Sequence, residues 1–120
     1  MIELEAIENV PYYSLEIPNL SDTPYIIKSE VLNNRTYYFE YFWNNRHQRA
    51  YLSIYILSNS EKVYLMRNKS LLPLINLSKY IINDNENWSG SLYFDSTDLG
   101  QGYNYNQENI STEYQLRYIP

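Results

Sequence analysis

The stretch from Thr36 to Ser58, TYYFEYFWNNRHQRAYLSIYILS, constrains the fold of this chain more than any other part of it. It contains eight of the twenty aromatic residues. Both of its arms are rich in the β-branched and aromatic side chains that suit a pleated, half-buried surface. The polar residues from Asn44 to Arg49 separate the arms, and asparagine tolerates the left-handed conformations of tight turns. The stretch therefore predicts a long antiparallel hairpin around which the rest of the chain packs.

The two arms of this hairpin differ in how their apolar residues alternate. In the second arm Leu52, Ile54 and Ile56 share one face, and we expect this aliphatic face to point into the core. The first arm has aromatic residues on both faces: Tyr38 and Phe42 on one, and Tyr37, Phe39, Tyr41 and Trp43 on the other. A strand with one face in water would not have this pattern. Either both faces are covered within the domain, or one of them is a docking surface.

Strand-like alternation recurs along the rest of the chain between polar turns. Further strands are predicted at residues 2–7, 12–17, 25–32, 62–66, 91–94 and 110–119. Residues 71–82 fit a helix or an extended crossing, and Pro73 favours the extended alternative. Residues 95–109 are predicted to be a long loop. About eight or nine short strands in 120 residues predict one all-β domain over residues 1–120, an antiparallel sandwich or small barrel.

Composition excludes several classes of protein. There are no cysteines, so neither disulfides nor thiolate metal sites are possible. The net charge of -5 and the lack of a concentrated basic patch argue against a nucleic-acid partner. No apolar run approaches the roughly 20 residues that span a bilayer, so we expect no membrane insertion. The first residues lack the positive segment of a signal peptide, and we expect synthesis in the cytoplasm of the host cell.

Few residues suggest chemistry. The single histidine, His47, lies in the predicted turn without a local nucleophile or orienting partner, and is expected to be a solvated turn residue. Asp84, Glu86, Asp95 and Asp98 form the best acidic group, but the spacing of a calcium loop is absent. We expect no enzymatic activity, no metal and no cofactor. A metal-assisted hydrolase using Asp95 and Asp98 is the weakest of the alternatives.

Several short motifs occur in an order that is recognisable. They are Ile17-Pro18, Pro24-Tyr25, the turn Asn44-Asn45-Arg46 before Tyr51-Leu52-Ser53-Ile54-Tyr55, Leu71-Leu72-Pro73, Gly90-Ser91-Leu92, Leu99-Gly100 and Leu116-Arg117-Tyr118. From about Ile17 to Tyr118, the chain resembles the phage baseplate plug family of contractile-tail baseplates. The resemblance implies a structural, non-enzymatic subunit of the virion tail. It also implies several copies in a symmetric assembly against hub, spike, tube or sheath-initiator proteins, and it implies no catalytic or ligand residues.

Aromatic and arginine side chains are the expected contacts with such partners, because interfaces are enriched in them. The candidate interface residues are Tyr37, Tyr41, Trp43, Arg46, Arg49, Trp88, Tyr103 and Tyr105, with the loop at residues 95–109 as a further contact surface. The alternative function is a carbohydrate-binding β-sandwich, in which tyrosine and tryptophan rings, including Trp43 and Trp88, would stack on a sugar.

Overall fold

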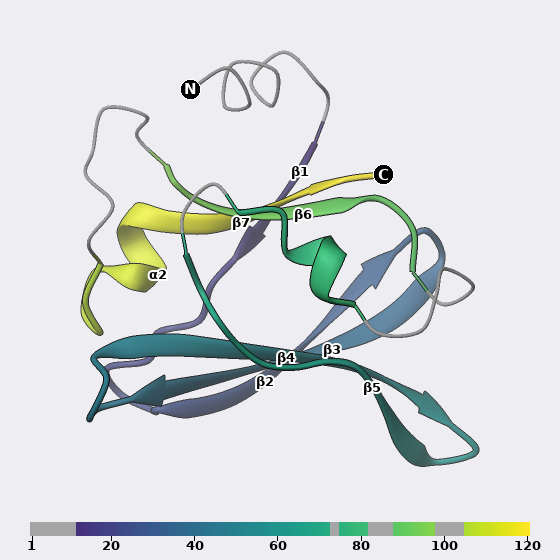
Figure 1. Ribbon diagram of the computed structural model, residues 1–120, viewed down its shortest axis with the longest axis horizontal. Helices are drawn as coiled ribbons and strands as arrows, with labels where there is room; N and C mark the ends of the chain where they lie inside the picture. Colours follow the sequence, from purple (N-terminus) through teal and green to yellow (C-terminus); the bar gives the residue numbers. More distant parts are fainter. Residues whose placement is uncertain (1–11, 73–74, 82–87, 98–104) are drawn as a thin grey trace.

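Seven strands form two antiparallel sheets in the computed structural model, which describes residues 12–72, 75–81, 88–97 and 105–120 (Figure 1). The strands are β1 (Tyr13–Glu16), β2 (Tyr25–Leu32), β3 (Arg35–Asn44), β4 (Arg49–Ser58), β5 (Glu61–Ser70), β6 (Ser91–Ser96) and β7 (Tyr114–Ile119). The strand pairing keeps the two sheets separate, so the fold is a sandwich and not a closed barrel. The prediction of an all-β sandwich is confirmed.

The larger sheet is a meander of consecutive hairpins in the order β2-β3-β4-β5. The predicted central hairpin is present as β3 and β4, with Tyr38 opposite Tyr55 and Trp43 opposite Ala50. A two-residue turn, Asn33-Asn34, joins β2 to β3, and both asparagines have positive φ, 52° and 63°. Such turns match the right-handed twist of the flanking strands. Local turn chemistry thus determines the order of strands in this sheet.

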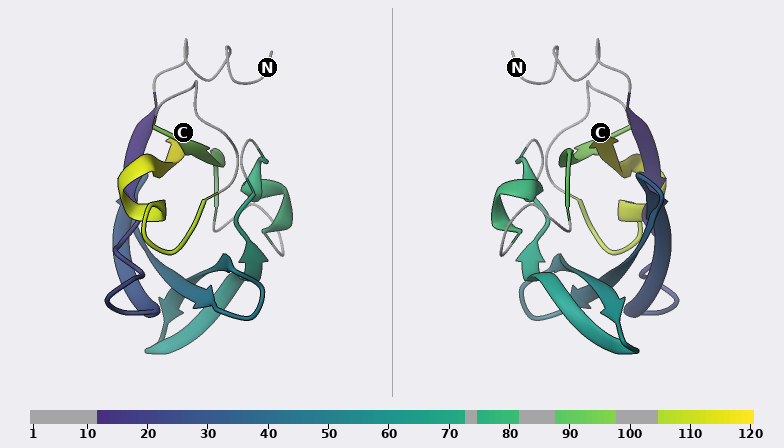
Figure 2. Two further views of the ribbon diagram at one scale, coloured as in Figure 1. Left: turned by 90° about the vertical axis from the view of Figure 1, so that its left-hand side faces the viewer. Right: turned by 90° about the vertical axis from the view of Figure 1, so that its right-hand side faces the viewer.

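The smaller sheet has the order β1-β7-β6, so its first and last strands come from opposite ends of the described chain. Leu15 of β1 lies opposite Leu116 of β7, which lies opposite Phe94 of β6. The two sheets face each other, with the larger sheet below the smaller one in Figure 1, and Figure 2 shows the two layers from either side. Only contacts distant in sequence assemble this second layer.

Side chains that alternate into the space between the sheets form one core. Those with no exposed surface include Phe39, Tyr41, Leu52 and Ile54 from the larger sheet and Leu92, Phe94 and Leu116 from the smaller one. Leu52 and Ile54 were predicted to lie in the core, and this is confirmed; Ile56 is partly buried and packs against the same cluster. Because both sheets contribute to one cluster, neither sheet has a core of its own.

Two segments differ from their predicted structure. In the part of residues 71–82 that is described, Leu77–Tyr80 is a 3-10 helix, η1, and not an extended crossing. It forms because the Asn76 side chain accepts a hydrogen bond from the Ser78 amide, 3.0 Å away. Similarly, residues 110–119 begin with a short helix, α2 (Ile110–Glu113), before β7, with the Ile110 amide bonded to the Asn106 carbonyl. Helices of four residues are too short to show a hydrophobic period.

The predicted strand at residues 2–7 lies outside the described residues. In the part of the chain that is described, no helix is long and apolar enough to cross a membrane.

Candidate interaction surface

The side chains of β3 alternate between the core and the outer face of the larger sheet. Tyr37, Tyr41 and Trp43 are 4%, 0% and 3% exposed, whereas Tyr38 is half-buried and Phe42 is 42% exposed. The first set was expected to contact a partner. Contrary to that prediction, these rings pack inside the domain, because the smaller sheet covers their face. The opposite face of β3 is the one left to the surface.

Trp88, another predicted contact residue, is also buried. Its ring lies edge-on to Tyr37 at 5.1 Å and to Tyr118 at 5.5 Å, which links the two sheets. Its indole N–H donates to the Ser78 hydroxyl and to the Gly90 carbonyl, each 3.2 Å away. With Trp43 and Trp88 both inside, a sugar-stacking platform that uses these rings is not on the surface.

Tyr105 has a structural role at the end of the core. Its hydroxyl accepts a hydrogen bond from the Ala50 amide at 3.1 Å and donates one to the Leu71 carbonyl at 2.9 Å. The ring lies edge-on to Phe94 and Trp43. Burial is the main cause of the raised pKa of Tyr105. This residue therefore ties β4 to the C-terminal part of the chain.

The remaining predicted contact residues are either exposed or outside the described part of the chain. Arg46 and Arg49 are exposed, in and beside the turn between β3 and β4, and are accessible to a partner. Tyr103 lies outside the described residues, with the rest of residues 98–104 of the predicted loop at residues 95–109. Asp95 and Ser96, its first two residues, are the buried end of β6 instead, because they pair with Gln115 and Tyr114 of β7.

The outer surface of the four-stranded sheet is rich in aromatic side chains, and we call it the tyrosine face. Its members are Tyr25, Ile27, Tyr38, Glu40, Phe42, Tyr51, Tyr55 and Tyr64. Tyr25, Ile27 and Phe42 are 47%, 40% and 42% exposed, and they adjoin one another because Tyr25 lies directly opposite Phe42. The β2–β3 side of this surface is therefore apolar, and the described part of the chain leaves it open.

Glu40 is the polar centre of the tyrosine face. Its carboxylate accepts hydrogen bonds from the hydroxyls of Tyr25 and Tyr64, the latter at 3.1 Å, and Lys62 Nζ lies 4.0 Å away. The hydrogen bond to Glu40 raises the pKa of Tyr25 to about 12, with smaller contributions from burial and from the negative charge. Both tyrosines thus remain neutral donors at ordinary pH, and the network fixes their orientation.

The β5 side of the tyrosine face is covered by the protein's own cations. Tyr55 stacks on Tyr38 at 5.1 Å and contacts Tyr64 at 5.3 Å. Lys62 Nζ lies 4.9 Å from the centre of the Tyr55 ring, and the Arg67 guanidinium lies 4.1 Å from that of Tyr64. Tyr55, in contact with two rings and with Lys62, is only 5% exposed. Open aromatic surface is concentrated on β2 and β3.

A shallow cavity of about 280 Å³ opens at one end of the tyrosine face, lined by Phe42, Asn44, His47, Tyr51 and Asn68. His47 was expected to be a solvated turn residue, and it is exposed. Its Nδ1 lies 3.0 Å from the Tyr51 hydroxyl, and its amide donates to the Asn44 side chain. The turn is therefore held against the sheet by side-chain contacts.

The predicted acidic group is not assembled among the described residues. Asp95 is buried, with its Oδ2 3.8 Å from Nη2 of Arg117. Asp84, Glu86 and Asp98 lie outside the described residues. Within residues 12–72, 75–81, 88–97 and 105–120, no three histidine or acidic side chains lie close enough together to hold a metal ion.

Comparison with protein families gives a match to nearly the whole chain. A family model described as "Cyanophage baseplate Pam3 plug gp18" matches residues 8–120, which is nearly the whole chain and includes every described strand. No curated protein matches the chain. The match covers the motifs between Ile17 and Tyr118 from which the family was predicted, and that prediction is confirmed. The chain belongs to the cyanophage baseplate Pam3 plug gp18 family of phage baseplate proteins.

Proposed function

We propose that this protein is a structural, non-enzymatic subunit of a contractile phage tail, where several copies pack against hub, spike, tube or sheath-initiator proteins in a symmetric baseplate. Membership of a baseplate plug family supports a structural role in the baseplate. The protein would act by shape and packing, with each copy adding contacts that hold its neighbours in register. It would be made in the host cytoplasm and then incorporated into the virion tail.

The observation that supports this function best is the tyrosine face. Tyr25, Ile27 and Phe42 form an apolar surface that the described residues leave open, on the opposite side of the sheet from the core. Interfaces are enriched in aromatic and arginine side chains, and Arg46 lies at the end of this face. The contact surface that we propose is therefore the tyrosine face with the Arg46 and Arg49 turn, in place of the buried rings predicted from the sequence.

The hydrogen bonds within the tyrosine face favour tight docking. Tyr25 and Tyr64 are both held by Glu40, and Arg67 lies over Tyr64. Side chains that are already ordered lose less conformational entropy when a partner binds. A pre-organised aromatic surface of this kind suits a permanent structural contact better than a transient one.

The first test is mass spectrometry of purified particles of the phage that encodes this chain. We expect the protein in every particle, in a constant ratio to the baseplate proteins. Consistent absence from intact virions would overturn the proposal.

The second test locates the surface. A phage lacking the gene is complemented with Phe42→Ser or with Val63→Ser, a matched control that removes an apolar side chain of similar exposure, 40%, from a position outside the tyrosine face. Because truncating a central interface side chain commonly costs about 2 kcal/mol, we expect Phe42→Ser to lower incorporation about tenfold or more. Val63→Ser should be incorporated normally. Equal incorporation of both folded variants would exclude the tyrosine face as the docking surface.

A further inference from the structure

The two edge strands of the larger sheet differ in how open they are to another strand. β5 is interrupted by register shifts opposite β4 between Leu52 and Tyr55, and it bears Lys62, Arg67 and Lys69. Bulges and cations are features that protect an edge from pairing. β2, by contrast, pairs with β3 over eight consecutive residues without a shift, and its Ile27 and Val31 are 40% and 70% exposed. β2 is the edge suited to a further strand.

The hydrogen bonding of β2 shows which of its backbone groups face outward. The Trp43 amide donates to the Pro24 carbonyl at 2.8 Å, and this pair continues the register of β2 and β3. Bonded pairs alternate along an antiparallel ladder, so the even-numbered residues of β2 bond to β3. The N–H and C=O groups of Tyr25, Ile27, Ser29 and Val31 therefore point toward the edge of the sheet, where no other described strand pairs with β2.

We propose that two copies of this protein associate through antiparallel pairing of their β2 strands, on a two-fold axis at Ser29. The four-stranded sheets would then join into one sheet of eight strands. Such a contact is isologous, because each copy presents the same strand to the other. Ser29 has outward-pointing backbone groups, so the two Ser29 residues would exchange both of their hydrogen bonds at the centre.

Several registers would let the outward backbone groups of the two β2 strands bond to each other. The charges of the β2 side chains favour the one with its axis at Ser29. Lys28 and Glu30 both lie on the inner face of β2, and within one chain Lys28 Nζ is 3.6 Å from Glu30 Oε2. An axis at Ser29 puts Lys28 opposite Glu30 of the second copy, and does so twice. An axis at residue 28 would put two lysines opposite each other, and an axis at residue 30 two glutamates. Opposite charges across a strand pair stabilise it, and like charges destabilise it.

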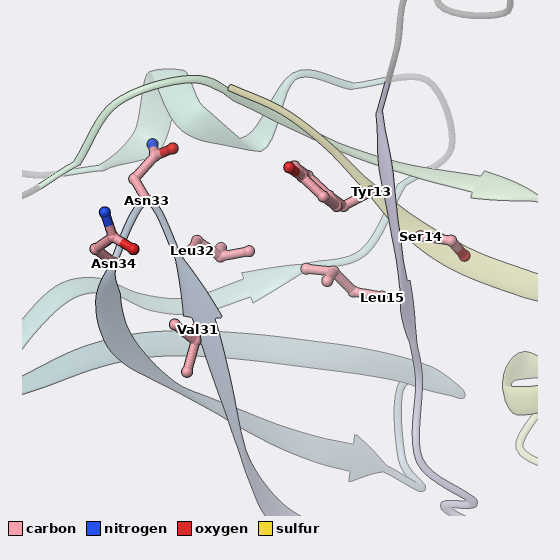
Figure 3. A pocket seen from close by; sticks show the side chains of 7 residues that line it. All are labelled: Tyr13, Ser14, Leu15, Val31, Leu32, Asn33 and Asn34. Carbon is pink, nitrogen blue, oxygen red and sulfur yellow. The ribbon is translucent and has the colours of Figure 1, made fainter.

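Apolar side chains fit the same register. On the outer face Ile27 would lie opposite Val31 of the second copy, which covers two of the exposed apolar residues. On the inner face Ile26 would lie opposite Leu32 of the second copy. Leu32 lines a cleft of about 490 Å³ between β1 and the end of β2. Figure 3 shows Leu15 and Leu32 pointing toward each other across it, an apolar floor for the incoming Ile26.

The lack of cysteine makes cross-linking a direct test. Residues in a bonded antiparallel pair have Cα atoms about 5.5 Å apart, within the range of a disulfide. Under mild oxidation, Ser29→Cys should form a covalent dimer. Ser58→Cys, also exposed on this sheet, is the matched control and should remain monomeric. Light scattering should give a dimer for the wild-type chain. A monomer at 100 µM, or equal cross-linking of both variants, would overturn the proposal.

Charge reversal tests the register itself. Lys28→Glu and Glu30→Lys each put like charges opposite each other twice, and each should weaken dimerisation about tenfold. Mixed together, the two variants should form a heterodimer, because every pair across the axis then has opposite charges. Lys28 also donates to the Glu16 carbonyl at 2.8 Å, so thermal unfolding of each variant must first show a folded chain. Dimers unaffected by reversal, or no association on mixing, would contradict the β2 pairing.

This inference stands on β2 and does not rest on the baseplate role. Suppose the wild-type protein is monomeric and is incorporated into virions, while the Phe42→Ser variant is not incorporated. That result would overturn the β2 pairing and leave the proposed function intact.

Discussion

Neighbouring residues of β3 have opposite environments, although their chemistry is nearly the same. Trp43 is 3% exposed and Phe42 is 42% exposed, because successive side chains of a strand point to opposite faces. The sequence shows the alternation but does not say which face is covered. That choice depends on the smaller sheet, whose strands come from both ends of the described chain.

Tyr25 is the residue whose chemistry is most clearly set by one neighbour. Because its hydroxyl donates to the Glu40 carboxylate, the pKa of Tyr25 is raised to about 12. We expect ultraviolet titration of the folded chain to show a tyrosine that ionises near pH 12 and is missing from Tyr25→Phe. In Glu40→Gln this pKa should move back toward 10, the ordinary value. An unchanged titration of Tyr25 in that variant would show that Glu40 is not the cause.

The same pKa predicts a dependence of stability on pH. The folded pKa lies above the unfolded one, so the folded state binds more protons between pH 10 and about 12. The stabilisation from Tyr25 should therefore be complete below pH 10 and be lost as the pH rises toward 12. The difference in unfolding free energy between wild type and Tyr25→Phe, measured by urea denaturation at each pH, should shrink across this window. A constant difference would contradict the linkage.

At the scale of elements, the turn Asn33-Asn34 fixes the pairing of β2 with β3. Asn34 has a φ of 63°, a left-handed conformation that costs a β-branched residue about 1–3 kcal/mol. We expect Asn34→Val to lower the unfolding free energy by about this amount and Asn34→Gly to be neutral or stabilising. Chemical denaturation measures both. Asn33 is a poorer test, because its side chain also donates to Ser89 and Tyr118. Equal stability of the two Asn34 variants would refute this account of the turn.

The strands and helices were predicted with unequal success for a physical reason. β3 and β4 were recognised because a hairpin is encoded locally, by alternation and by a polar turn. η1 and α2 were missed because helices of four residues are too short to show an apolar period. For η1 the visible local signal is only the side-chain cap of Asn76. β6 was predicted too short, since Asp95 and Ser96 are polar residues that only pairing with β7 buries.

At the scale of the whole molecule, the two sheets share one core and should unfold together. Trp43 belongs to the larger sheet, Trp88 lies between Tyr37 and Tyr118 of opposite sheets, and both belong to the same buried cluster. We expect tryptophan fluorescence and far-ultraviolet circular dichroism to give the same midpoint in urea, as a single cooperative transition requires. Separate midpoints would show that the sheets are independent units.

By itself, the sequence determined the all-β class, the central hairpin, the family and the division of β3 into two aromatic faces. These features depend on local alternation, turn residues and short motifs, all of which are written along the chain. The tertiary structure decided which aromatic face is core, that Trp88 and Tyr105 hold the sheets together, and that β2 is an edge strand among the described strands. Each of these depends on contacts between residues distant in sequence, such as β1 with β7, and no local pattern specifies them.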